Sequence, residues 1–348
     1  MKEFGSDFHF LNNYEGGTSI YKVYPEATFV ANGRQAINLL IKNFGWSRIW
    51  IPAYFCYEII DSIKNTNIKV VLYDDYPFAN DVELMKSLPY KKGDVLLRMN
   101  FFGLRGYRSN KDLKVPVIED HTHDLLGEWT QQSDADWCIA SLRKTLPIAE
   151  GGMIWSPKGH QIKTSLYPTS RNAAVSERRW YAMIEKASYL KGSNVNKNLF
   201  RNYFLQTEEE FDMLRVSEID PFGQAYLKNF DIQTWKKQKN KNWKLLNNNL
   251  KCPLFEVLIP ENERCNPFSY TILFKNSDTR NRYRKALIEN YVYPAILWQV
   301  PESSDEDIRN FSERMLSIHC DGRYVEEDIE QLITILGKVA QNVQNYKI

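Results

Sequence analysis

A repeated alternation of short apolar runs with helical segments is the feature that most constrains the fold of this chain. Runs of β-branched and aromatic residues, typical of strands, cover residues 48–52, 68–73, 94–99, 115–120 and 135–140. Between the first two runs lies a segment with the spacing of a short helix, residues 58–64. Strand, helix and strand in succession predict a parallel sheet with helices against it. Since ligands bind at the carboxyl ends of such strands, the polar residues that end each run are candidates for function.

A helix is predicted just before the first of these strands. Apolar side chains between residues 36 and 44 recur at helical spacing. Asn32 is expected to cap this helix and Gly45 to end it, whereas the residues before it form an irregular arm. Gly33 opens the helix, where backbone N–H groups and the helix dipole favour an anion such as phosphate. An ordinary helix start has the same pattern, so Gly33 alone decides nothing.

The second half of the chain predicts a helical stretch followed by a smaller unit. Residues 176–230 are helical and polar, and the basic segment 235–251 predicts a long solvated helix beside a domain boundary. We therefore expect a large domain at 1–235 and a small domain at 236–348. The small domain is expected to hold a strand, a helix, an extended run and a terminal helix, at 268–274, 279–290, 292–300 and 326–346. The fold class is α/β, with a mostly parallel sheet flanked by helices and a smaller C-terminal α+β domain.

Composition excludes several classes of protein. Of the 348 residues 43% are hydrophobic and 25% charged, and the net charge is +2. These values argue against a disordered or fibrous chain and leave no strong field to recruit nucleic acid or a membrane surface. No apolar run approaches the roughly 20 residues of a membrane span, and the N-terminus lacks the pattern of a secretory signal. The five cysteines are scattered without a Cys-x-x-Cys pair, so we expect reduced thiols and a soluble, cytoplasmic protein.

Residues capable of metal or acid chemistry follow the run at 115–120. Asp120 closes this run, so its carboxylate is expected to be partly buried and to need a cation, although turns and helix caps use the same residue. His121 and His123 stand two apart, on one side of an extended backbone, where a metal site could start. The other histidines have no zinc spacing. A metal-dependent hydrolase built on Glu119, His121 and His123 is the alternative enzyme.

Lys144 follows the run at 135–140 and precedes the turn Glu150-Gly151-Gly152. Most lysines are solvated surface charges. A lysine that leaves an apolar strand end and enters a glycine-bounded loop can instead lose its hydration and act as a nucleophile. Lys144 is therefore a candidate catalytic amine.

Taken in order, these segments resemble the pyridoxal-phosphate enzymes of the aspartate aminotransferase fold, and among them the sugar aminotransferases named after DegT, DnrJ, EryC1 and StrS. Residues 32–36, Asn-Gly-Arg-Gln-Ala, are similar to the Ser-Gly-Thr-x-Ala turn that binds the cofactor phosphate. Residues 51–55 resemble the segment that supplies an aromatic ring over the pyridine, and residues 117–123 resemble the Glu-Asp-Ala-Ala-His block. Residues 140–144, with 150–152, resemble the block of the lysine that binds the cofactor covalently.

The resemblance implies a role for each matching residue. Lys144 would bind the aldehyde of pyridoxal 5'-phosphate and move protons, and Asp120 would keep the ring nitrogen protonated. His123 would lie near the ring hydroxyl. Residues at the helix start and at the strand end before the lysine would hold the phosphate, and one of two adjacent aromatic residues would cover a ring face. The set assigned to the cofactor is Gly33, Arg34, Tyr54, Phe55, Asp120, His123, Ser141 and Lys144.

The resemblance implies a homodimeric aminotransferase that takes an amino group from an amino acid such as glutamate and gives it to a keto-sugar, expected to be nucleotide-linked. The product would serve surface-polysaccharide or other amino-sugar synthesis. In one departure from the family pattern, Ser141 lies only three residues before Lys144, where many members have a longer spacing. A catalytically silent homologue that binds sugars or a partner protein would have no reason to keep both Lys144 and Asp120, and this chain has both.

Overall fold

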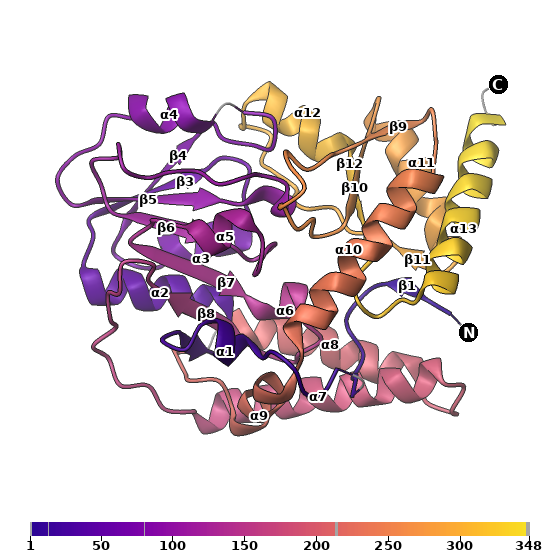
Figure 1. Cartoon of the computed structure of the whole chain (residues 1–348), viewed down its shortest axis with the longest axis horizontal. Coiled ribbons are helices and arrows are strands. Elements are labelled where there is room, and N and C mark those ends of the chain that lie inside the picture. Colours follow the sequence, from indigo (N-terminus) through magenta and orange to yellow (C-terminus); the bar gives the residue numbers. More distant parts are fainter. Residues whose placement is uncertain (1, 13, 80, 213–214, 346–348) are drawn as a thin grey trace.

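A single large sheet organises the N-terminal half of the chain (Figure 1). The computed structural model describes residues 2–12, 14–79, 81–212 and 215–345. Within these ranges the sheet has seven strands in the order β2-β8-β7-β6-β5-β3-β4. Their bounds are β2 (Thr28–Val30), β3 (Arg48–Pro52), β4 (Lys69–Tyr73), β5 (Asp94–Met99), β6 (Val117–Asp120), β7 (Trp137–Ser141) and β8 (Gly152–Trp155).

Five adjacent strands run parallel to one another, namely β4, β3, β5, β6 and β7. β8 pairs antiparallel with β7, and β2 pairs antiparallel with β8. Every residue of β5 and β6 is buried, which is the pattern of strands covered on both faces. The predicted α/β fold with a mostly parallel sheet is confirmed, and each of the five predicted strands of the sheet lies within two residues of its expected bounds.

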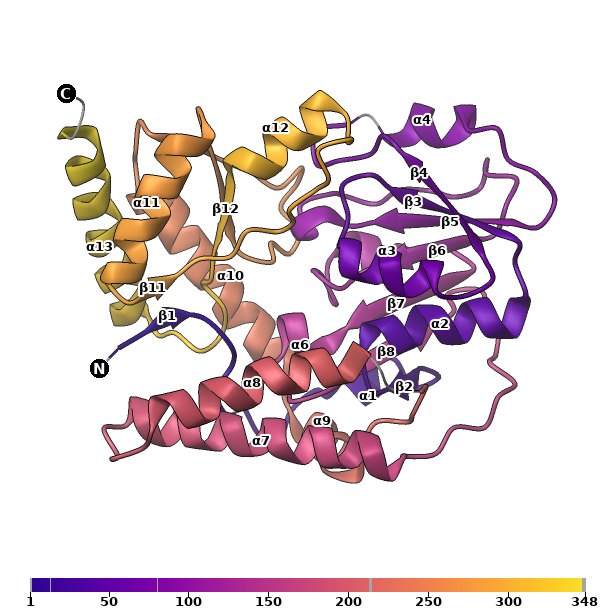
Figure 2. The same cartoon turned by 180° about the vertical axis from the view of Figure 1, so that it is seen from behind.

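Helices cover both faces of this sheet (Figures 1 and 2). One face packs against α2 (Gly33–Phe44) and α3 (Tyr57–Lys64). The other face packs against α1 (Ile20–Val23), α7 (Ser170–Leu190) and α9 (Pro221–Asn229). Shorter helices lie in the connections, namely α4 (Asp81–Ser87), α5 (Glu128–Gln132), α6 (Leu142–Thr145) and a 3-10 turn at Phe101–Gly103.

The sequence signals at both ends of α2 are confirmed. The Asn32 side chain accepts a hydrogen bond from the Gln35 N–H at 3.0 Å, which caps the first turn. Gly45 ends the helix with a φ of 60°, a conformation that glycine adopts without steric cost. The apolar face of α2 is buried against the sheet. This packing fixes the start of α2 beside the carboxyl edge of the parallel strands.

A helical hairpin of α7 and α8 (Lys197–Asp212) follows the sheet and packs below it in Figure 2. α10 (Ile232–Asn249) then crosses to the C-terminal part of the molecule. The prediction that this helix is solvated is wrong, because Trp235 and Trp243 of α10 are buried. Trp235 packs on Phe230, and farther along α10 packs on α13 (Glu326–Asn345). Since α10 runs through residue 235, the division into 1–235 and 236–348 stays a prediction.

The C-terminal part is built on a three-stranded antiparallel sheet in the order β12-β10-β9. Its strands are β9 (Phe255–Val257), β10 (Tyr270–Phe274) and β12 (Met315–Ile318), and its helices are α11 (Ser277–Glu289), α12 (Glu306–Arg314) and α13. The extended run predicted at 292–300 is a strand only at β11 (Val292–Tyr293). β11 pairs with β1 (Phe4–Gly5), so the N-terminal arm begins in the C-terminal part and then passes to the large sheet (Figure 1).

Two further sequence expectations concern the whole chain. Among the helices of the described ranges, none combines the length and the apolar character that a bilayer crossing requires. All five cysteines are free thiols in the structure, and Cys138, Cys265 and Cys320 are buried. This agrees with the prediction of reduced thiols.

Candidate active site

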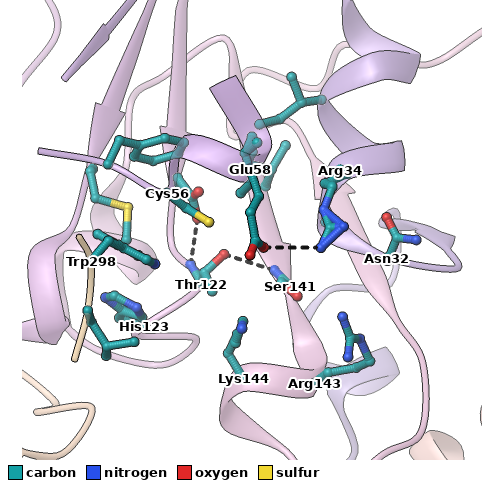
Figure 3. Close-up of a pocket in the computed structure, with 18 of the residues that line it drawn as sticks. Asn32, Arg34, Cys56, Glu58, Thr122, His123, Ser141, Arg143, Lys144 and Trp298 are labelled. Carbon is teal, nitrogen blue, oxygen red and sulfur yellow. Dashed lines mark hydrogen bonds and ion pairs between the residues drawn. The ribbon is translucent and has the colours of Figure 1, made fainter. Parts of the chain in front are cut away.

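A pocket opens at the carboxyl ends of β5, β6 and β7, beside the first turn of α2 (Figure 3). Segments far apart in the sequence meet there, as expected where parallel strands end at one edge of a sheet. Among the residues predicted to bind a cofactor, those that line the pocket are Gly33, Arg34, Phe55, Asp120, His123, Ser141 and Lys144. Tyr54 does not line it.

Asp120 is the last residue of β6 and lines the pocket. The side chain is buried, and Oδ1 accepts a hydrogen bond from the Thr122 N–H at 2.8 Å. Burial raises the pKa of Asp120, because the charged form loses its hydration. Within the described ranges no lysine or arginine pairs with this carboxylate. A buried acid of this kind fits a ligand that brings its own positive charge.

His123 lies in the pocket wall as a neutral ring. Its Nδ1 accepts a hydrogen bond from the Phe102 N–H at 3.1 Å, and its ring stacks on Trp298 with centroids 5.4 Å apart. Burial, together with the nearby charge of Lys144, lowers the pKa of His123 to about 3. The imidazole is therefore neutral at physiological pH and carries its proton on Nε2. Nε2 is the atom through which His123 can donate a hydrogen bond.

The prediction that His121 and His123 share one side of the backbone is wrong. β6 ends at Asp120 and a turn follows, so the alternation of a strand is lost. His121 packs on the core of the opposite face of the sheet, where its Nε2 lies 3.0 Å from the Glu119 carboxylate and its Nδ1 lies 3.0 Å from the Thr130 hydroxyl. Both ring nitrogens thus have protein partners. The metal-dependent hydrolase built on Glu119, His121 and His123 is not favoured, because His123 lies in the pocket wall, apart from Glu119 and His121.

Gly33 lets the first turn of α2 approach the end of β7. A Cβ atom on Gly33 would lie 2.9 Å from the Cβ of Ser141, closer than real side-chain carbons come. The Ser141 N–H donates a hydrogen bond to Thr122 Oγ1 at 2.9 Å, which fixes this strand end from the other side. The dipole of α2 and a serine side chain therefore meet at one end of the pocket. Such an end suits a phosphate group.

The two adjacent aromatic residues point in different directions. Tyr54 is buried, and its hydroxyl donates a hydrogen bond to the Leu297 carbonyl. Its ring packs against Phe101 and Phe311 rather than in the pocket. Phe55 lines the pocket. Of the two, Phe55 is the candidate to cover a ligand ring.

Lys144 lies on the single turn of α6, directly after β7. Its side chain points into the pocket beside that of Arg143 (Figure 3). Lys144 is exposed, whereas the sequence predicted an amine that had lost its hydration. The reason is its position at the border of the pocket with a wider cleft, since Lys144 lines both spaces. The amine and the Asp120 carboxylate thus line the same pocket from different elements.

Solved structures similar to this chain over most of its length include several aminotransferases. Spr1654 from Streptococcus pneumoniae in its PMP-form, named as a sugar aminotransferase, has 11% identity and a TM-score of 0.68 over 99% of both chains. Helicobacter pylori PseC, an aminotransferase involved in the biosynthesis of pseudoaminic acid, has 12% identity and a TM-score of 0.65 over 98% of this chain and 100% of that one. A DegT DnrJ EryC1 StrS aminotransferase from Brucella abortus has 13% identity and a TM-score of 0.59 over 94% and 92%. The chain has the fold of these aminotransferases. No family model and no curated protein matches the sequence.

Within this aminotransferase fold, the structure adds residues that the sequence did not single out. Thr122 holds both Asp120 and Ser141 through the two hydrogen bonds described above. Trp298 reaches the pocket from the C-terminal part, and Glu208 reaches it from α8. These contacts join segments that are far apart in the sequence, so no local pattern could reveal them. Thr122 alone had a local signal, because it lies between two residues of the block at 117–123.

Proposed function

We propose that the protein is a pyridoxal-phosphate-dependent aminotransferase that moves an amino group from an amino acid to a keto-sugar. The observation that carries this proposal is the meeting of Asp120 and Lys144 in one pocket, with the start of α2 at its end. A buried carboxylate without a cation, an accessible amine and an anion-binding helix start are the three groups that such a cofactor needs.

The residues present fit the cofactor at each of its functional groups. The contact of Gly33 with Ser141 forms the phosphate end, and Arg34 lines the same end. Asp120 would accept a hydrogen bond from the protonated ring nitrogen, and the Nε2–H of His123 would donate to the ring oxygen. Phe55 would cover a ring face. When bound, pyridoxal phosphate supplies an electron sink for the carbon that carries the transferred nitrogen.

The chain's own groups then have separate tasks. Asp120 would keep a proton on the ring nitrogen, because a buried anion is stabilised by the positive charge opposite it. Thr122 would hold the Asp120 carboxylate in place through its backbone N–H. Lys144, on the open side of the pocket, would carry protons between the substrate carbon and the cofactor.

The substrates belong to the proposal as well. The similar solved structures include proteins named as sugar aminotransferases, which supports a sugar as the acceptor. We take an amino acid such as glutamate as the donor and a nucleotide-linked keto-sugar as the acceptor, in a cytoplasmic homodimer.

An absorption spectrum of the purified protein with pyridoxal phosphate, recorded before and after glutamate is added, tests this function. We expect the band of the protein-bound aldehyde to be replaced by that of the amine form of the cofactor. A protein that binds the cofactor and shows no change with any amino acid would contradict an aminotransferase.

A further inference from the structure

Beyond Lys144 the pocket continues into a wider cleft between α6, the α7–α8 hairpin and the segment 293–297. Lys144, Arg143 and Glu208 line both spaces, whereas Asp120 lines only the pocket and Arg179 only the cleft. A substrate that approaches Lys144 from outside the cofactor's own space would therefore pass along Arg143 and Arg179.

Three guanidinium groups share a single carboxylate at the wall of this cleft, because Arg34 of the pocket also lies 3.4 Å from Glu208. Glu208 lies 2.7 and 3.0 Å from two nitrogens of Arg143, and 3.2 Å from Arg179. The side chains of Arg143 and Arg179 are only 7% and 8% exposed, whereas that of Glu208 is 36% exposed. The Glu208 carboxylate is therefore more exposed to solvent than the Arg143 and Arg179 side chains that it pairs with.

The carboxylates that pair with Arg143 and Arg179 are more exposed than the arginines themselves. Burial and the neighbouring charge of Arg143 lower the pKa of Arg179 to about 10. Burial opposes ionisation of Glu208, but Arg143 and Arg179 outweigh it and hold the pKa of Glu208 well below its usual value. Asp7 lies 3.3 Å from Arg179, but its side chain is 44% exposed at the rim. Like charges this close favour a further anion.

A hydrogen-bond donor of the same cluster is also unused. Nε of Arg143 is buried and has no hydrogen-bond partner among the described residues. A buried donor without a partner costs stability, and a guanidinium is built to bind two oxygens of one carboxylate or phosphate. The unused donor and the buried guanidinium groups point to the same class of ligand.

We propose that Arg143 and Arg179 form a substrate-binding site for an oxyanion, with Glu208 as the residue that positions them. This inference rests on the proposed function, because the site takes its meaning from its place next to Lys144. The oxyanion is a carboxylate of the amino donor or a phosphate of the acceptor. Both present oxygens that match the guanidinium pair.

Calorimetric titration of the protein with glutarate and with pyrophosphate, each with and without saturating pyridoxal phosphate, tests this site. We expect one of the two probes to bind in the presence of the cofactor, and Arg143→Gln or Arg179→Gln to weaken that binding about tenfold or more. Glutarate as the affected probe assigns the site to the donor, and pyrophosphate assigns it to the acceptor. Glu208→Gln should tighten the same probe, since a competing anion is removed, whereas a purely structural role would not.

The chain offers matched controls on the same two helices. Arg178 and Glu210 form a surface pair at 2.7 Å and line neither space. Arg178→Gln and Glu210→Gln should leave both titrations unchanged. Arg143→Lys keeps the charge and loses the paired donors, so it serves if Arg143→Gln fails to fold.

The proposal is overturned if neither probe binds, if pyridoxal phosphate abolishes the binding, or if the Arg143 and Arg179 variants behave like the Arg178 control. Attachment of pyridoxal phosphate to Lys144 is measured on the same samples. Loss of that attachment would reject the proposed function, while the titrations would still decide whether Arg143 and Arg179 bind an oxyanion.

Discussion

Gly33 and Ser141 are so close that a single added carbon on Gly33 would lie 2.9 Å from the Ser141 Cβ. The first turn of α2 and the end of β7 are therefore in direct contact, although 108 residues separate them along the chain. This contact places the positive end of the helix dipole at the end of the pocket.

Gly33→Ala should destabilise the protein by about 1–3 kcal/mol, the usual cost of an extra carbon in a close-packed contact. It should also weaken binding of pyridoxal phosphate, because α2 must move away from Ser141. Urea unfolding and a cofactor titration measure the two effects. Gly337→Ala is the control, since nothing lies within 4 Å of a Cβ at Gly337 in α13, and we expect a gain of about 0.5–1 kcal/mol there. Equal stability of the Gly33 variant and the wild type would show that the contact is not tight.

Asp120→Asn should leave the cofactor able to attach and should slow turnover by roughly 10²–10³-fold, the effect of removing one preorganised electrostatic group. The amide has the size of the carboxylate and can keep the hydrogen bond from Thr122, but it cannot hold a proton on the ring nitrogen. Single-turnover rates with glutamate, compared with the amount of bound cofactor, separate the two steps. Rates near those of the wild type would refute the role given to Asp120.

Above about pH 6.5, where histidines with lowered pKa values no longer titrate, stability should fall as the pH rises toward 9, because of Glu150. Burial and the adjacent Asp220 raise the pKa of Glu150 to about 9. The folded protein therefore keeps a proton on Glu150 that the unfolded chain releases once the pH exceeds the ordinary pKa of glutamate. The loss is at most about 1.4 kcal/mol per pH unit. Glu150→Gln should flatten this slope, because the glutamine amide does not titrate. Asn172 can turn its own amide to accept a hydrogen bond from the new NH₂ group. Exposed Glu177→Gln is the control, and a wild-type slope that matches the Glu150 variant would contradict the assignment.

Acid should destabilise the protein between about pH 6.5 and 4, because of three histidines that the fold desolvates: His123 is buried, and His9 and His319 are half-buried. Burial, with a neighbouring cation in each case, lowers the pKa of His9 and His123 to about 3 and that of His319 to about 4. These rings stay neutral in the folded protein while the unfolded chain takes up protons, so stability is lost as the pH falls. Urea unfolding at several pH values measures the slope. Glutamine at any of the three positions should reduce it, and His160→Gln, at an exposed site, should not.

The extent to which the sequence predicted this molecule depends on how local each signal is. Asn32 and Gly45 bound α2 through contacts within one turn, and the apolar runs gave the strands of the large sheet. Asp120 and Lys144 stood out because Asp120 closes a predicted strand and Lys144 lies just after another. The sequence failed where a strand ends, since the turn after Asp120 sends His121 and His123 to opposite sides.

Long-range packing decided the rest. Trp298 and Glu208 reach the pocket from helices and loops whose place depends on the whole fold, and neither has a neighbour in sequence that marks it. The choice between Tyr54 and Phe55 also depended on tertiary structure, because Tyr54 donates its hydroxyl to a carbonyl 243 residues away. For α10, a basic composition suggested a solvated helix, but its tryptophans are buried between two parts of the molecule.

Borohydride reduction of the protein with pyridoxal phosphate, followed by mass spectrometry of its peptides, tests the central claim most directly. We expect one pyridoxyl group per chain, fixed to Lys144, and none in Lys144→Ala. Lys239 is a rival amine, because burial lowers its pKa to about 8, as it does for Lys186. Pyridoxyl on Lys239, or on no lysine at all, would contradict the account.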